Sequence, residues 1–477
     1  MTININQILT SATGENNALH EKHVNPRFVK TLRTIGFDRC YNRAEGQYLW
    51  DIHGRQYLDM LAGYGVFNVG RNNPDIRQAL TDFMELNYPS LVQLGAPLLS
   101  GLLAKELKQR MPNELDYVYF TNSGTEGVET AIKFAHRATG RPGIVYAHKA
   151  FHGLSNGSLS LNGDKIFREG FGALLTDCME VPFGDIESLD QALSGKNIAA
   201  FFIESVQGKG VNIPPEGYLK QAQELCQHYG TLFVADEIQC GMGRTGKFLA
   251  LEHEGDMDPD IIILSKALSG GYVPVGAVLT RKWIYNKVFS SMDRSVVHSS
   301  TFGQGSLAMV AGLATLEYMD EYKLMENATA MGNLLGEQLT ELKDSYEFIQ
   351  DIRWRGLMLA IEFGMPKSLK LQAAWTLAHK LNKSLFPQAI TIPLLQDHGI
   401  LTQVAGHNVD IIKLIPPLVI DKTDIDHFVS SFKAVMDSLH KFPGPCWEVI
   451  SRIGKAAVQN KPDMNEKKPL TGMPIHK

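Results

Sequence analysis

Six short and mostly apolar segments recur along the 477 residues of this chain and constrain its fold more than any other feature. They occupy residues 117–120, 144–147, 198–203, 232–235, 261–264 and 275–280. Runs of this length and composition are typical of strands that are buried on both faces. Helical periodicity separates them: in the stretch 218–229, one face carries Leu219, Ala222, Cys226 and Tyr229. This alternation predicts an α/β domain with a mostly parallel sheet flanked by helices.

The remainder of the chain indicates a second, smaller unit. A chain of 477 residues exceeds what one simple core contains, which favours one large domain with a companion. After about residue 330 the pattern changes to longer helices with few strands. The final stretch, residues 461–477, is rich in Lys and Pro, which is typical of a disordered tail.

Composition and charge exclude several classes of partner. The formal net charge is −5 with both signs mixed along the chain, so we expect no nucleic-acid partner. The longest apolar stretches, such as residues 198–203, are too short to span a membrane. Five cysteines lie scattered without metal-ligand spacing, namely Cys40, Cys178, Cys226, Cys240 and Cys446. Because the first residues also lack the features of a signal peptide, we expect a cytoplasmic protein without a bound metal.

The first expected strand leads into a candidate phosphate site. In open α/β sheets, ligands bind beyond the carboxyl ends of the strands. Residues 117–120 are followed by Ser123, Gly124 and Thr125, and Ser123 and Glu126 have the spacing of a capping box. Alone, this segment favours a well-capped helix and nothing more. The alternative is an anion site, in which Gly124 permits close approach, Thr125 supplies a hydroxyl and the helix N-terminus supplies N–H groups.

Two further strand ends carry ionisable residues. Asp236 follows the strand at 232–235, either as a charge that reaches solvent or as a carboxylate that holds the cation of a ligand. Lys266 follows the strand at 261–264, where a lysine is costly unless it is paired, neutral or covalently modified. An acid and a lysine on successive strand ends, with an anion site nearby, suggest one cofactor. Pyridoxal phosphate needs a lysine for its Schiff base, an acid for its ring nitrogen and a cradle for its phosphate.

Several segments together resemble a known family. In order along the chain they read NSGTEGVETAIKFA, KAFHG, IESVQGKG, LFVADEIQCGMGRTGKF, ILSKALSGGYVPVGAV and HSSTFG, preceded by AEGQYLWDIHGRQYLDMLAGYGVFNVG. They are similar to the successive motifs of class III pyridoxal-phosphate aminotransferases, and the resemblance runs from about residue 40 to residue 440. It implies fold type I, with an N-terminal segment (1–60) that packs with the small domain, a large cofactor domain (61–330), a small α+β domain (331–440) and a C-terminal helix and tail (441–477).

The resemblance implies a role for each residue around the cofactor ring. Lys266 forms the Schiff base and moves the proton, and Asp236 pairs with the pyridine nitrogen. Gln239 bonds the ring hydroxyl. Phe151 stacks on the ring, with His152 beside it. The ordinary pKa of a lysine, about 10.4, is too high for attack at neutral pH, and burial after the strand at 261–264 lowers it.

The phosphate and the remaining pocket follow from the same resemblance. Ser123, Gly124 and Thr125 surround the phosphate, joined by Thr301 from the neighbouring subunit of a homodimer with shared active sites. Glu204 matches an acidic residue of the pocket whose duty is less defined. The resemblance thus implies a homodimer that acts on a small-molecule amine and a 2-oxo acid by a ping-pong mechanism.

Four positions bear on the substrate. Many members of the family carry an arginine where this chain has Leu154, and a second arginine and a glutamate where it has Lys413 and Lys209. Because lysine offers a point charge where arginine grips a carboxylate with two hydrogen bonds, these exchanges are not conservative. Tyr64 matches a tyrosine that lines the substrate pocket of ornithine aminotransferases. We therefore expect an ω-amine as donor: a diamine, a terminal amine or the side-chain amine of a basic amino acid.

Other activities of this scaffold and two short motifs offer alternatives to the aminotransferase function. The same scaffold also supports aminomutase, epimerase and decarboxylase chemistry, and a non-catalytic relative would have lost Lys266 or Asp236. The segment GMGRTG (241–246) has dinucleotide-binding spacing and GLSNG (153–157) has that of a nucleophile elbow. Other residues separate both from the preceding strand, and no helical pattern follows GLSNG, so both are weak signals.

Overall fold

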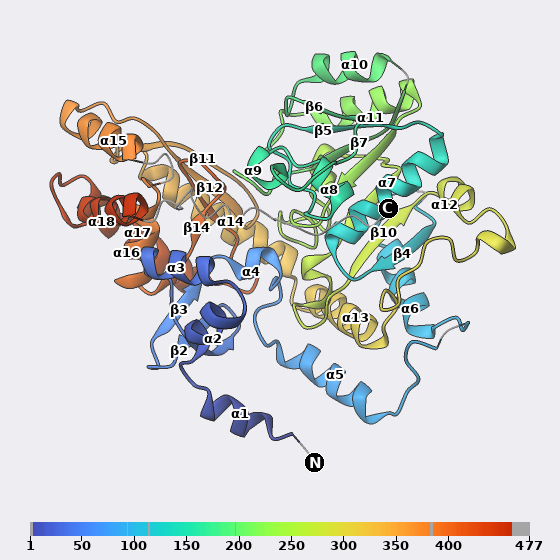
Figure 1. The fold of residues 1–477 in the computed structure, drawn as a ribbon, viewed down its shortest axis with the longest axis horizontal. Coiled ribbons are helices and arrows are strands. Elements are labelled where there is room, and N and C mark those ends of the chain that lie inside the picture. The colour runs from blue at the N-terminus through green and yellow to red at the C-terminus, as the bar shows by residue number, and fades with distance from the viewer. Residues whose placement is uncertain (1–2, 93, 113–114, 196, 382–384, 460–477) are drawn as a thin grey trace, which may run out of the picture.

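The computed structural model describes residues 3–92, 94–112, 115–195, 197–381 and 385–459. The chain forms two lobes, and Figure 1 shows the green and yellow middle of the chain in one lobe and the dark-blue N-terminal and orange-to-red C-terminal described segments in the other. The larger lobe is built on a seven-stranded sheet of order β4-β10-β9-β8-β7-β5-β6. Its strands are β4 (Tyr117–Thr121), β5 (Gly143–Ala147), β6 (Cys178–Val181), β7 (Ile198–Glu204), β8 (Leu232–Asp236), β9 (Ile261–Leu264) and β10 (Gly276–Thr280).

This sheet confirms the predicted α/β architecture. Strands β5 to β9 pair in parallel, and β10 is antiparallel to both of its neighbours. All six predicted strands are present, and the seventh, β6, lay outside the prediction. Cys178–Val181 forms the edge of the sheet with a half-exposed burial pattern, so it contains no continuous apolar run.

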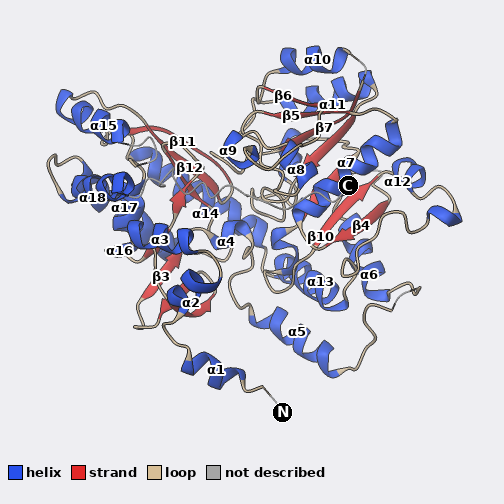
Figure 2. Cartoon of the chain, in the orientation of Figure 1, coloured by secondary structure: helices blue, strands red, loops and turns tan. Residues whose placement is uncertain are grey.

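Helices cover both faces of the large sheet, as Figure 2 shows. α7 (Gly124–Thr139) packs on β7, β9 and β10, and α11 (Tyr218–Tyr229) packs on β8. Successive strand residues alternate between the two apolar clusters: Ile261 and Ile263 face α7, while Ile262 and Leu264 join the cluster that contains α11. Burial on both sides explains why these strands read as unbroken apolar runs.

The remaining helices complete both lobes. In the large lobe they are α4 (Ala62–Gly65), α5 (Pro74–Glu85), α6 (Leu98–Lys108), α8 (Asn156–Ser160), α9 (Lys165–Arg168), α10 (Ile186–Ser194), α12 (Lys282–Val288) and α13 (Ser306–Glu321). The others are α1 (Ile5–Ser11), α2 (Asn16–His23), α3 (Pro26–Ile35), α14 (Leu324–Glu341), α15 (Leu369–Leu381), α16 (Gln388–Gln396), α17 (Lys422–Leu439) and α18 (Pro445–Gln459).

The smaller lobe contains two four-stranded sheets. One has the order β1-β2-β3-β13, with β1 (Tyr41–Glu45), β2 (Tyr48–Asp51), β3 (Gln56–Asp59) and β13 (Ile400–Leu401). The other has the order β11-β12-β15-β14, with β11 (Ile349–Arg355), β12 (Met358–Phe363), β14 (Gln403–Val404) and β15 (Ile411–Leu414). Parallel pairing of β3 with β13 joins the N-terminal strands to the C-terminal part of the chain.

A buried arginine in the GMGRTG segment ties the lobes together. Arg244 donates to the carbonyl oxygens of Leu357 at 2.9 Å and Pro416 at 2.5 Å, and to Asn68 Oδ1 at 2.6 Å. Two glycines of the segment, Gly243 and the final residue Gly246, have positive φ values of 81° and 86°. The segment therefore forms tight turns that present a structural cation, where a dinucleotide site would lead directly into a helix.

One sequence expectation requires correction: α8 begins at Asn156, inside the GLSNG segment, so a helical turn is present where no helical pattern was expected. Around residue 330, the expected domain boundary, the structure has one continuous helix, Leu324–Glu341, and the boundary itself stays a prediction. The predicted disordered tail, residues 461–477, lies outside the described residues. In the part of the chain that the structure describes, helices that combine the length and apolarity needed to cross a membrane are absent.

Candidate active site

A cavity of about 680 Å³ lies beyond the carboxyl ends of β7, β8 and β9, between the two lobes. Residues from both of the lobes seen in Figure 1 belong to its lining, so each lobe supplies part of the site. All but two of the residues singled out from the sequence are among its lining: Tyr64, Gly124, Thr125, Phe151, His152, Leu154, Glu204, Lys209, Asp236, Gln239, Lys266 and Lys413. Ser123 and Thr301 are the two that lie outside it.

The strand register brings the charged residues to one edge. Glu204 and Asp236 are register partners at the ends of β7 and β8. Lys266 begins the short 3₁₀ turn Lys266–Ser269 after β9, with a left-handed φ of 44° that is unusual for a residue with a side chain. Burial lowers the pKa of Lys266, against the opposing charges of Asp236 and Glu204. This lysine therefore loses its proton more easily than an exposed one.

Asp236 has a fixed partner behind it. His152 Nδ1 lies 2.7 Å from Asp236 Oδ2, and both side chains are buried. Burial disfavours protonation of His152, but the hydrogen bond and charge of Asp236 prevail and raise its pKa above 6.5. His152 Nε2 is buried without a hydrogen-bond partner among the described residues. His152 thus orients the Asp236 carboxylate, which sequence spacing did not indicate because 84 residues separate the two.

The N-terminus of α7 meets the cavity, but its capping differs from the expectation. Ser123 Oγ accepts a hydrogen bond from Glu126 N at 3.3 Å, as the capping box predicts. Glu126 Oε2 accepts from Asn122 N at 2.7 Å, one residue before the N-cap, so the box forms only in part. The Ser123 side chain is engaged in this cap, which accounts for its position outside the cavity.

Thr125 connects α7 to the segment that follows Phe151. Its hydroxyl lies 2.8 Å from Ser155 Oγ and 2.7 Å from Ser158 Oγ. Gly153, with φ of 133°, allows this approach because a Cβ there would lie 2.4 Å from Thr125 Oγ1. Ser155 also donates to Glu129 Oε1 at 2.6 Å, and within the described residues its hydroxyl bonds no histidine. The GLSNG segment therefore lacks the base that a serine nucleophile needs.

Gln239 and Lys413 close the inner end of the cavity. Gln239 Nε2 donates to the carbonyl oxygen of Tyr64 at 2.9 Å. Lys413 Nζ donates to the carbonyl oxygen of Gly208 at 2.9 Å and to Gln239 Oε1 at 3.3 Å. Burial, and next the charge of Lys266, lowers the pKa of Lys413 to about 7. Lys413 is thus a buried donor whose charge is marginal at neutral pH.

Lys209 lies among aromatic rings at the outer part of the cavity. Its Nζ is 4.1 Å from the centroid of Phe167 and 5.1 Å from that of Phe151. Phe167 and the segment at residues 403–407, which comprises β14 and the turn after it, line the same cavity and were missed in the sequence. Both lie outside the quoted motifs, and their short segments carry no distinctive spacing. Only the packing of α9 and of the small lobe brings them here.

Thr301 is exposed and stands apart from the cavity of its own chain. The preceding residue, Ser300, accepts a hydrogen bond from Asn122 Nδ2 at 2.7 Å, which fixes this segment next to the start of α7. In the described residues, groups of three or more His, Cys, Asp or Glu side chains with a metal-binding arrangement are absent.

The low pKa of Lys413 makes a prediction about stability. In the unfolded chain Lys413 keeps its proton up to its ordinary pKa of 10.5, whereas in the folded, cofactor-free protein it loses the proton above about 7. Between these values the unfolded state binds more protons, so the stability contributed by this residue rises with pH. The urea midpoint of the wild type minus that of Lys413→Met should be constant below about pH 7 and should become more positive towards pH 10, because the wild type gains stability over this range. Lys220→Met, an exposed lysine on α11, is the control; a difference that falls with pH contradicts the prediction.

Comparison with known proteins agrees with this geometry. Residues 33–436 match the family described as aminotransferase class-III. The chain is 38% identical over 455 residues to the aminotransferase PigE of a Serratia strain, in an alignment that covers 89% of this chain and 53% of PigE. The chain therefore spans about half the length of this curated relative.

Two solved structures illustrate the likeness in fold. An ornithine aminotransferase from Toxoplasma gondii, with partial occupancy of PLP at its active site, has a TM-score of 0.78 at 27% identity and covers 92% of this chain and 100% of its own. A thermostable (S)-enantioselective omega-transaminase from Thermomicrobium roseum has a TM-score of 0.75 with the same identity and coverage. With a family match over most of its length, the chain belongs to the class III aminotransferases.

Proposed function

We propose that this aminotransferase moves an amino group from an ω-amine to a 2-oxo acid by a ping-pong mechanism. The observation that carries the proposal is the presence of Lys266 and the His152–Asp236 pair in one largely apolar cavity at the strand ends. A lysine with a lowered pKa is a nucleophile and proton carrier, and a fixed carboxylate is a partner for a cationic ring nitrogen.

The cofactor is pyridoxal phosphate, and the residues present fit it. The cavity of about 680 Å³ lies within the usual range for such ligands, ~300–1,000 Å³. The N-terminus of α7 offers N–H groups and a favourable dipole to a phosphate. Gly124 is suited to this place because a Cβ there would lie 2.8 Å from Ile238. When bound, the cofactor supplies an electron-withdrawing ring that stabilises negative charge on the substrate carbon.

Each side chain of the site has one task in this proposal. Lys266 holds the cofactor through Nζ and carries the proton to and from the substrate carbon. Asp236 accepts a hydrogen bond from the ring nitrogen, and His152 keeps that carboxylate in place. Phe151 covers the ring, and Gln239 bonds its hydroxyl.

The phosphate is held by Gly124 and Thr125, next to the Ser123 cap, and by Thr301 of a second subunit. Glu204 positions the walls of the cavity, because its carboxylate accepts hydrogen bonds from Phe151 N at 2.9 Å and Gly208 N at 2.7 Å. Burial raises the pKa of Glu204, and these two hydrogen bonds oppose the rise.

The apolar lining supports an ω-amine as donor. Leu154, Phe151, Phe167, Val404 and Ala405 line the cavity. An α-amino acid brings a carboxylate beside its reacting carbon, and burying that charge against apolar walls is costly unless a cation pairs with it. A terminal amine brings only a carbon chain, which these walls favour. The kinship in fold with an omega-transaminase agrees with this donor class.

Aminomutase, epimerase and decarboxylase activities, or a non-catalytic role, are the alternatives on the same scaffold. Lys266 and Asp236 are both present, which disfavours a non-catalytic protein. Transfer of the amino group to a second molecule, a 2-oxo acid, separates an aminotransferase from the other three activities.

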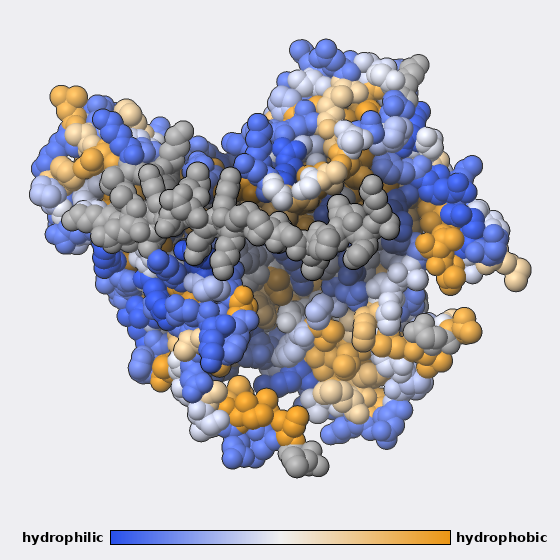
Figure 3. Space-filling model, in the orientation of Figure 1, coloured by the Kyte–Doolittle hydropathy of each residue, from blue (hydrophilic) through white to orange (hydrophobic). Residues whose placement is uncertain are grey.

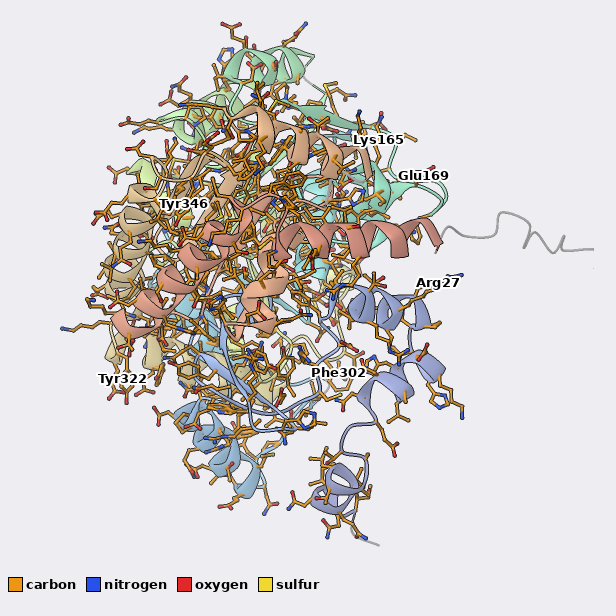
Figure 4. All side chains as sticks on the ribbon, turned by 90° about the vertical axis from the view of Figure 1, so that its left-hand side faces the viewer. Arg27, Lys165, Glu169, Phe302, Tyr322 and Tyr346 are labelled. Atoms are coloured by element: carbon orange, nitrogen blue, oxygen red, sulfur yellow. The ribbon has the colours of Figure 1, made fainter. Side chains whose placement is uncertain are left out.

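We further propose a homodimer with shared active sites. Large apolar side chains are exposed in two segments, at Met84, Leu86, Val92 and Leu94 and at Val296 and Phe302. The segments meet where Ser306 N donates to Ser90 Oγ at 3.2 Å. Figure 3 shows apolar surface over α5, α6 and α13, and Phe302, the residue after Thr301 in the sequence, is labelled in Figure 4. Exposed apolar surface of this extent marks an interface.

The division of the chain is part of the same proposal. The N-terminal segment, residues 1–60, belongs with the small domain, which the pairing of β3 with β13 supports. The large cofactor domain comprises residues 61–330 and the small domain residues 331–440, and α18 belongs to the C-terminal part, residues 441–477. All five cysteines are free thiols, in agreement with a cytoplasmic location.

Borohydride treatment of the yellow holoenzyme tests the cofactor assignment. Reduction should trap the pyridoxyl group on Lys266 Nζ, because this is the lysine beside Asp236, and peptide mapping should find it there. Lys266→Ala should lose turnover while retaining its fold. Label on Lys209 or Lys413, which line the same cavity, or on no lysine at all, contradicts the assignment.

A panel of donors tests the substrate class. Putrescine, longer primary amines, ornithine and 2,4-diaminobutyrate should convert the enzyme faster in single-turnover spectra than alanine or glutamate, because the cavity is apolar. Leu154→Arg should shift this preference towards glutamate, with Leu154→Met as the matched control. The ω-amine proposal is wrong if glutamate or alanine reacts far more efficiently than every ω-amine in the wild type.

Sedimentation tests the dimer. The holoenzyme should sediment at twice the mass of the chain, and Thr301→Ala should weaken cofactor retention by roughly 10- to 100-fold, the effect of losing a hydrogen bond to a charged group worth about 1.5–3 kcal/mol. Ser299→Ala, in the same exposed segment, is the control. A fully active monomer would refute the shared site.

A further inference from the structure

Three lysines among the described residues line the cavity, and the ammonium group of Lys209 lies against Asp164 and two phenylalanine rings. Its Nζ is buried and makes no hydrogen bond to the described residues. The nearest carboxylate oxygen, Asp164 Oδ2, is 3.6 Å away, slightly beyond hydrogen-bond length. The rings of Phe167 and Phe151 lie 4.1 Å and 5.1 Å from Nζ. An ion pair of this length and two cation–π contacts hold the ammonium weakly.

The other lysines lack this freedom. Lys413 Nζ has two acceptors, the carbonyl oxygen of Gly208 and Gln239 Oε1. Lys266 stands beside Asp236 at the strand end. Lys209 lines the cavity while its Nζ points into the contact with Asp164 and the rings, and a four-carbon stem allows that group to swing.

We propose that Lys209 is a movable cation that binds the carboxylate of the 2-oxo acid acceptor and withdraws to Asp164 when the amine donor occupies the cavity. This inference rests on the proposed function and specifies how one cavity serves both substrates. An ω-amine arrives as a cation with an apolar chain, and a lysine fixed in its path repels it. A 2-oxo acid brings a carboxylate that the apolar walls cannot hold alone.

In the withdrawn position, Asp164 attracts the ammonium group of Lys209 without a hydrogen bond to it. Asp164 caps α9, with Oδ1 accepting from Ile166 N at 3.2 Å, so its carboxylate is fixed in direction. The turn after β14 packs against the stem of Lys209, since a Cβ on Gly406 would lie 3.9 Å from Lys209 Cβ. Stem and anchor are thus positioned by both lobes, while Nζ has no hydrogen bond to break.

Matched acceptors test the carboxylate contact. The ratio of kcat/KM for a 2-oxo acid (pyruvate or 2-oxoglutarate, whichever the wild type prefers) to that for propanal, at a fixed amine donor, isolates the acceptor half of the reaction. Lys209→Met should lower this ratio by roughly 10- to 100-fold, the effect of removing a charge-assisted hydrogen bond. Lys209→Arg should restore most of it. Lys165→Met, on the exposed face of α9 (Figure 4), should leave it unchanged.

Removing the charge of Asp164 tests whether Lys209 withdraws to this residue. Asp164→Asn keeps a residue that caps α9 but removes the charge that holds Nζ aside. The ratio should rise, and the KM for the amine donor should rise with it, because Lys209 then stays in the cavity.

The outcomes separate this inference from the proposed function. If the wild type converts neither ω-amines nor 2-oxo acids, the proposed function fails. If it converts both and Lys209→Met leaves the ratio unchanged, or Lys413→Met lowers it instead, only the inference fails. A fall in the ratio for Asp164→Asn likewise overturns the withdrawal of Lys209.

Discussion

The hydrogen-bond register of β7, β8 and β9 is the constraint on which the site depends. Parallel pairing places Glu204 beside Asp236, and pairing of β8 with β9 brings Lys266 to the same edge. A slip of one residue in any of these strands would turn its terminal side chain to the opposite face. Because these strands are apolar on both faces, no alternation of apolar and polar residues opposes such a slip, and the packing of individual side chains against α7 and α11 sets the register instead.

The two carboxylates at this edge are tolerable because each has defined partners. Asp236 is paired with His152, and the Glu204 carboxylate accepts two backbone N–H groups. These bonds also tie the segments at residues 151 and 208 to the strand ends, so the walls of the cavity and its charges form one network. Among the described residues, no side-chain hydrogen bond holds the proton of Lys266, which is consistent with its lowered pKa.

Much of the large domain and its site was predictable from local patterns. The six strands follow from apolar runs, and Asp236 and Lys266 were found because a charge directly after a buried strand is conspicuous. The edge strand β6 and the short strands β13 and β14 escaped, since two to four residues with mixed exposure carry no periodic signal. The partial capping box at Ser123 shows the same limit. The spacing indicates that Ser123 and Glu126 can bond each other's backbone, but in the structure the Glu126 carboxylate accepts from Asn122 N instead of Ser123 N.

By itself, the sequence determined the alternation of strands and helices, the family, and the identity of the lysine and the carboxylate at the strand ends. These depend on neighbours in the chain, through burial periodicity and motif order. Only the tertiary structure decided that His152 supports Asp236, that Phe167 and the segment at 403–407 line the cavity, and that Lys209 rests against Asp164. Such contacts join segments tens to hundreds of residues apart, and packing between separate elements sets their distances, which no local pattern encodes.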